Sequence, residues 1–147
     1  MKRNLALALV VAATALLVLA CGGDGAVEVK VSLKEWSIEL TDGRSEIEAG
    51  DVRVIARNGG TKPHQLVVIK SDLPPQELSV VDGKVDEERV NIIGEIEPFA
   101  AGETARATLQ LSPGKYLLIC NVVEVLPGES PEGHYRNGMV APLFVTD

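Results

Sequence analysis

Residues 120–139 read CNVVEVLPGESPEGHYRNGM, and this stretch decides what the rest of the chain must build. It contains three side chains with metal-binding atoms, Cys120, His134 and Met139. A fourth, His64, lies upstream in residues 58–69, NGGTKPHQLVVI. One thiolate, two imidazoles and one thioether form the donor set of a mononuclear copper electron-transfer site, in which Cys and two His make a plane and Met binds weakly along the axis.

The N-terminus has the pattern of an export signal. Lys2 and Arg3 precede an uncharged, Leu- and Ala-rich run of residues 5–20. This run is shorter than the roughly 20 residues that span a bilayer as a helix. A basic start, a short apolar core and a small residue before the cleavage point are typical of a secretory signal peptide. We therefore predict that residues 1–20 are removed.

The junction of Ala20 and Cys21 resembles the lipobox of bacterial lipoproteins. That resemblance implies a lipoprotein-type signal peptide, and a Cys21 that carries lipid and becomes the new N-terminus. An ordinary secretory cleavage after Ala20 is the alternative. The predicted organisation is a signal peptide at 1–20, a tether at 21–25 and a single copper-binding domain at 26–147. The protein would be exported and lipid-anchored to the outer face of the cytoplasmic membrane, or on the periplasmic side.

The charge and the cysteine count of the mature chain limit its partners and chemistry. Without Lys2 and Arg3, 12 basic residues remain against 21 acidic ones, a net charge of −9. Such acidity argues against nucleic acid and permits a basic protein partner. If Cys21 carries lipid, Cys120 has no intramolecular mate, although exported proteins fold in an oxidising compartment. Cys120 is then either an inert buried thiol or a metal thiolate.

Short β-strands separated by turns account for most of the remaining chain. Apolar and polar residues alternate at 26–33, 36–40 and 104–111, which predicts half-buried strands. Further strands are expected at 45–48, 52–57, 64–69, 91–97, 115–123 and 143–146. Between two of them, residues 71–90 hold Pro74-Pro75 and Asp82-Gly83, which predict an irregular excursion. Strands in this arrangement indicate an all-β sandwich or barrel of one domain, which we expect to be a monomer.

Three motifs resemble the cupredoxins, the small blue copper proteins. They are Asn58-Gly59 ahead of His64, Pro113-Gly114-Lys115-Tyr116 leading into Cys120-Asn121, and Gly133-His134-Tyr135 followed by Gly138-Met139. The resemblance covers about residues 27–146. It implies a Greek-key β-sandwich of about seven or eight strands and one type 1 copper. His64, Cys120 and His134 would lie in the copper plane, with Met139 axial. The implied function is to shuttle single electrons between redox partners.

The chain departs from this family between Cys120 and His134. Family members usually have two to four residues between these ligands, and here there are 13. Residues 124–132 therefore form an insertion, which leaves the rigidity of the site open. The family also implies that the edge of His134 faces solvent as the route for electrons, among Pro63, Val140, Ala141 and Pro142. Gln65 would support the site. Glu124, Glu129 and Glu132 would form either an acidic rim for a basic partner or a solvated loop.

Two other functions remain open from the sequence. One is a copper carrier or chaperone that delivers the metal itself, which the long loop could favour. The other is a metal-free sandwich that serves as an adhesion or assembly module. An enzyme is not expected, because the sequence has no nucleophile motif and no second His cluster.

Overall fold

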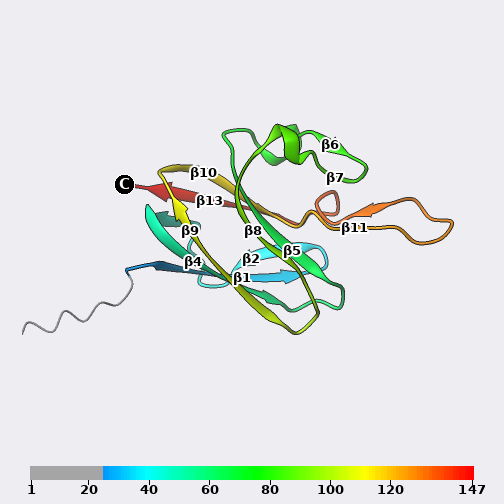
Figure 1. Cartoon of the computed structure of the whole chain (residues 1–147), viewed down its shortest axis with the longest axis horizontal. Coiled ribbons are helices and arrows are strands. Elements are labelled where there is room, and N and C mark those ends of the chain that lie inside the picture. The colour runs from blue at the N-terminus through cyan, green and yellow to red at the C-terminus, as the bar shows by residue number, and fades with distance from the viewer. Residues whose placement is uncertain (1–24) are drawn as a thin grey trace, which may run out of the picture.

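Two β-sheets face each other in the computed structural model, which describes residues 25–147 (Figure 1). The first sheet has the order β2-β1-β4-β9, formed by β2 (Ser37–Leu40), β1 (Val27–Lys34), β4 (Gly50–Asn58) and β9 (Thr104–Leu111). The second has the order β3-β13-β10-β5-β8, formed by β3 (Glu46–Glu48), β13 (Val140–Thr146), β10 (Gly114–Ile119), β5 (His64–Lys70) and β8 (Asn91–Phe99). The predicted signal peptide and Cys21 lie outside the described residues.

The core between the sheets follows from the alternation in the sequence. In β1, Val29, Val31 and Leu33 are buried, while the polar residues between them face outward. The other sheet supplies Tyr116, Leu118 and Leu143 to the same core. The hydroxyl of Tyr116 donates to the carbonyl of Ser112 at 2.7 Å, so this buried ring has the partner that its polar end requires.

The predicted excursion at 71–90 covers the outer face of the second sheet. It contains the 3-10 helices η1 (Pro75–Glu77) and η2 (Glu87–Arg89) and the short hairpin of β6 (Val80–Val81) and β7 (Lys84–Val85). Leu78 and Val85 pack on Val67, Ile69 and Ile119 from β5 and β10. These two strands are therefore buried on both faces, which explains why their sequences are continuous apolar runs.

The all-β sandwich predicted from the sequence is confirmed. Within residues 25–147 its two sheets contain nine strands, slightly more than the expected seven or eight, and two short hairpins lie beside them. The last strand begins at Val140 instead of residue 143, although it contains Pro142. Proline is tolerated because β3 pairs only with residues 144–146, so the strand has one hydrogen-bonded neighbour at Pro142. Among residues 25–147, the helices are too short to cross a bilayer.

Candidate metal centre

The four predicted ligands come from two neighbouring strands and one loop. His64 is the first residue of β5, and Cys120 directly follows β10. These strands are antiparallel, with Val67 opposite Ile119, so the start of one lies beside the end of the other. The backbone N–H of Gln65 donates to the Cys120 Sγ at 3.4 Å, which joins the two ligand positions directly.

The loop 133–139 closes on this pair through backbone hydrogen bonds. His134 N–H donates to the carbonyl of Val122 at 3.0 Å, and Met139 N–H donates to the carbonyl of His134 at 3.1 Å. Cys120 N–H in turn donates to the carbonyl of Met139 at 3.1 Å. Gly138 permits this turn because its φ is +111° and a Cβ would lie 3.2 Å from the carbonyl oxygen of Trp36.

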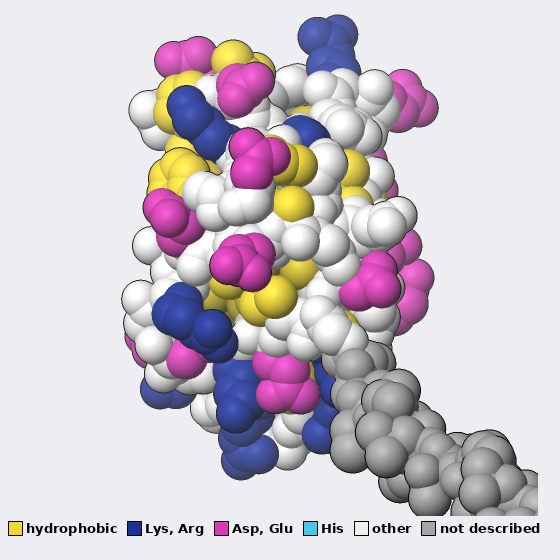
Figure 2. Space-filling model, turned by 90° about the vertical axis from the view of Figure 1, so that its left-hand side faces the viewer, with side chains coloured by type: hydrophobic (Ala, Val, Ile, Leu, Met, Phe, Trp, Pro, Cys, Tyr) yellow, Lys and Arg dark blue, Asp and Glu magenta, His cyan; other side chains and the backbone are white. Residues whose placement is uncertain are grey.

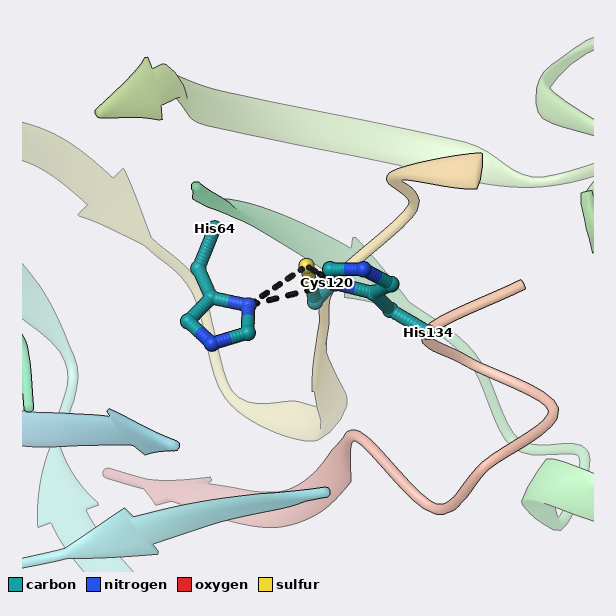
Figure 3. A group of neighbouring side chains, drawn as sticks. All are labelled: His64, Cys120 and His134. Atoms are coloured by element: carbon teal, nitrogen blue, oxygen red, sulfur yellow. Dashed lines mark hydrogen bonds between the residues drawn. The ribbon is translucent and has the colours of Figure 1, made fainter. Parts of the chain in front are cut away.

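Three ligand atoms converge in the interior (Figure 3). Nδ1 of His64 lies 3.1 Å from Nδ1 of His134, and Cys120 Sγ lies 3.8 Å and 3.4 Å from these two nitrogens. All three side chains have an exposed fraction of 0%. The donor atoms lie within 4.8 Å of one another, a group that can hold one metal ion. Met139 is also fully buried.

Burial controls the protonation of these side chains. It lowers the pKa of both His64 and His134 below the ordinary value, so each imidazole is neutral and can act as a ligand. Burial also raises the pKa of the Cys120 thiol, only partly opposed by N–H groups of Gln65 and Val122. A metal ion that binds a thiol displaces its proton, so the thiolate form would accompany binding. The two imidazoles and one thiolate fit a single type 1 copper ion.

The opposite nitrogens of the two rings face carboxylates. Glu35 Oε1 lies 3.4 Å from His64 Nε2, and Glu124 Oε1 lies 3.7 Å from His134 Nε2. Both Nε2 atoms are fully buried, and neither has a hydrogen bond of normal geometry. Burial would raise the pKa of Glu35, but hydrogen bonds from backbone N–H groups, including those of Thr61 and Lys62, lower it to about 2. The carboxyl beside His64 is therefore ionised.

The expectation that His134 faces solvent is wrong. Its ring is fully buried, and the indole of Trp36 lies against it edge-on, with 5.1 Å between the ring centroids. The ammonium of Lys62 lies 5.5 Å from the centroid of the Trp36 ring. Trp36, in the turn between β1 and β2, therefore covers one side of the His134 ring.

The insertion at 124–132 is a hairpin closed at its base. β11 (Val123–Glu124) pairs with β12 (Glu132–Gly133), so the extra residues leave the sandwich and return at the same place. Lys62 forms ion pairs with Glu124 and, at 3.5 Å, with Glu132. The hairpin base thus stands directly beside His134, while Val125 and Leu126, which follow β11, are exposed. The longer sequence interval does not separate the ligands.

Sequence reasoning missed several residues that form this site. Glu35, Trp36 and Lys62 lie far from the ligand motifs, and their residue types alone carry no signal for a role there. Gln65 was expected to support the site, and its side chain instead donates to Glu95 at 3.2 Å on the surface. The support comes from the backbone N–H of Gln65, which any residue except proline would supply.

A sandwich with a buried His-Cys-His cluster at one end defines a class of fold, and solved structures identify it. No protein-family model and no curated protein matches the sequence. Reduced auracyanin from Roseiflexus castenholzii matches with a TM-score of 0.56 and 19% identity, covering 84% of this chain and 100% of that one. Auracyanin A, a "blue" copper protein from Chloroflexus aurantiacus, matches with a TM-score of 0.55 and 22% identity over 83% of this chain and 100% of that one.

Reduced rusticyanin is similar as well, with a TM-score of 0.55 and 20% identity over 82% of this chain and 79% of that one. These structures share the cupredoxin fold. The protein therefore has the cupredoxin fold, as the motifs around its ligands predicted.

Proposed function

We propose that the chain is an exported, membrane-tethered type 1 copper protein that shuttles single electrons between redox partners. The observation that carries the proposal is the cluster of His64, Cys120 and His134, whose ligand atoms meet in the interior of a cupredoxin sandwich. These three residues would form the copper plane, and Met139 would be the axial ligand. Copper would supply a one-electron couple, and the protein would supply no substrate chemistry of its own.

Burial of the ligands favours an electron carrier over a copper chaperone. Transfer of the metal itself requires a partner's ligands to reach the ion, and Cys120 and His134 have no exposed surface. Electron transfer has no such requirement. β5, which begins with His64, and β10, which leads into Cys120, are also buried on both faces, which limits rearrangement of the site when the charge of the metal changes.

Copper titration of the purified protein tests the proposal. We expect one equivalent of Cu(II) to give an intense absorption band from the Cys120 thiolate, and Cys120→Ser to abolish that band. Repeated one-electron reduction and oxidation should leave copper in the protein. A colourless Cu(II) form would refute the type 1 assignment, loss of copper on each cycle would favour the chaperone, and failure to bind copper would favour the metal-free module.

The proposed lipid anchor at Cys21 fits the orientation of the domain. The C-terminus and the first described residues lie at one end of the sandwich (Figure 1), whose surface carries basic and acidic side chains side by side (Figure 2). β1 starts there and runs towards Asn58, whose side chain donates to the Lys62 carbonyl just before His64. A tether at residues 21–25 would thus leave the metal end directed away from the membrane. Mass spectrometry of the native N-terminus tests this, and an unmodified Cys21 would refute the anchor.

A basic redox partner is the remaining part of the proposal. The acidic net charge supports such a partner. The proposed acidic rim carries less unpaired negative charge than its sequence implies, because Glu124 and Glu132 are paired with Lys62. Glu129 is exposed on the same hairpin. Electrostatic docking predicts that the electron-transfer rate falls as ionic strength rises. A rate independent of salt would refute a basic partner.

A further inference from the structure

Each imidazole of the candidate site has a carboxylate against its outer nitrogen, and nothing in the proposed function requires this pairing. We propose that Glu35 and Glu124 are positioning residues that fix the two histidine ligands and favour Cu(II) over Cu(I). The inference rests on the proposed copper site and adds a means by which this chain sets its reduction potential. Trp36, Lys62 and the base of the hairpin lie around the two histidines and their carboxylates.

Glu35 is held in place by the loop that leads into His64. Its Oε1 accepts the backbone N–H groups of Thr61 at 2.8 Å and Lys62 at 2.7 Å, and the same oxygen lies 3.4 Å from His64 Nε2. Gly60 leaves room for the carboxylate, because a Cβ there would lie 2.6 Å from Glu35 Oε2. The carboxylate is therefore fixed before any metal binds, on the side of the ring opposite the cluster.

Glu124 is held by a different device on the other ring. Lys62 Nζ bonds Glu124 Oε2, which leaves Oε1 directed towards His134 Nε2 at 3.7 Å. Pairing in β11–β12 places Glu124 opposite Glu132 at the base of the inserted hairpin. The insertion thus brings a carboxylate to the buried nitrogen of His134. Lys62 contacts both this carboxylate and, through its backbone N–H, Glu35.

The chemistry of the two carboxylate–histidine pairs predicts which oxidation state of copper they favour. When Nδ1 of each ring binds a metal, Nε2 carries the proton, and a facing carboxylate fixes that tautomer and makes the ring a stronger donor. Two negative charges near the metal also stabilise Cu(II) more than Cu(I), which lowers the reduction potential. The carboxylate side chains are 21% and 22% exposed, so solvent weakens the effect without removing it.

Glutamine substitutions in the full chain test the proposal. Glu35→Gln and Glu124→Gln remove the charges and keep an oxygen that can accept the bonds from Thr61, Lys62 and the lysine ammonium. We expect each substitution to lower the ratio of Cu(II) affinity to Cu(I) affinity about tenfold. This change raises the reduction potential by about 59 mV for one electron. Glu129→Gln on the exposed part of the same hairpin is the matched control and should leave the potential unchanged. Circular dichroism checks that each variant is folded.

Zinc affinity provides a second readout that does not depend on redox chemistry. Loss of a group that orients a metal-binding histidine typically costs 10- to 100-fold in affinity, so both variants should bind Zn(II) more weakly than the Glu129→Gln control. Potentials and zinc affinities equal to the control in both variants would overturn the inference. A wild-type protein without the thiolate-to-Cu(II) band would instead refute the proposed function, and the zinc measurement would still decide the role of the two carboxylates.

Discussion

Asn121, which follows Cys120, ties the end of β10 to the excursion that covers the second sheet. The side chain is 5% exposed, and its Oδ1 accepts the backbone N–H of Val85 at 2.7 Å. Its Nδ2 donates to the carbonyl of Val85 at 3.1 Å and to Glu87 Oε1 at 2.8 Å. Replacing Asn121 with Ala removes all three hydrogen bonds and leaves both backbone groups of the fully buried Val85 without this partner.

The expected loss of stability follows from these bonds. A hydrogen bond contributes about 1 kcal/mol net, and a buried group left unsatisfied costs roughly 1–3 kcal/mol. Asn121→Ala should therefore lower the free energy of unfolding by about 3 kcal/mol, a large part of the roughly 5–15 kcal/mol that stabilises a domain. At about 4 °C for each kcal/mol in a domain of this size, the midpoint of thermal unfolding should fall by roughly 12 °C.

Urea unfolding of the metal-free protein measures this loss without a contribution from metal binding. Asn137→Ala is the control, because the Asn137 side chain is exposed and donates to the Glu132 carboxylate at 3.2 Å, so the free energy of unfolding should change by no more than about 0.5 kcal/mol. Hydrogen exchange of the Val85 amide should become faster in the Asn121 variant alone. A loss of stability equal to that of the control, together with unchanged exchange at Val85, would show that the excursion is held by its apolar contacts instead.

Two further changes test the cover of the site and the loop before the first ligand. Trp36→Ala should make metal removal by a chelator several-fold faster, because the indole covers His134. Trp36→Phe should retain much of the protection. Equal rates of metal removal in the two variants would show that the ring does not protect the site. Gly60→Ala should cost roughly 1–3 kcal/mol of unfolding free energy, because the new Cβ lies 2.6 Å from Glu35 Oε2 and moving this carboxylate breaks its bonds from the N–H groups of Thr61 and Lys62. Gly59→Ala meets nothing closer than 3.5 Å and should unfold as the wild type does in urea, so equal losses in the two variants would contradict the steric argument.

The fold was predictable because its pattern is local. Alternation of apolar and polar residues at 104–111 gives a strand whose bounds agree with β9, and the prolines and turn residues of 71–90 predicted the excursion. The ends of the strands near the site were harder to predict. Residues 115–123 are all compatible with a strand, yet β10 ends at Ile119, and a separate strand, β11, begins at Val123 and pairs with β12. That pairing depends on residues 132–133 and leaves no signal within residues 115–123.

The sequence by itself determined the sandwich and the set of candidate ligands. Burial patterns repeat every second residue, and the chain beyond residue 21 has one thiol, two imidazoles and one thioether to offer. Only the tertiary structure decided that His134 is buried, that the insertion closes beside it, and that Glu35 and Glu124 face the outer nitrogens of the rings. These contacts join separate turns of the chain, and a turn's sequence does not encode which neighbour packs against it. The surroundings that set the properties of a metal site are for this reason not visible in the motifs that supply its ligands.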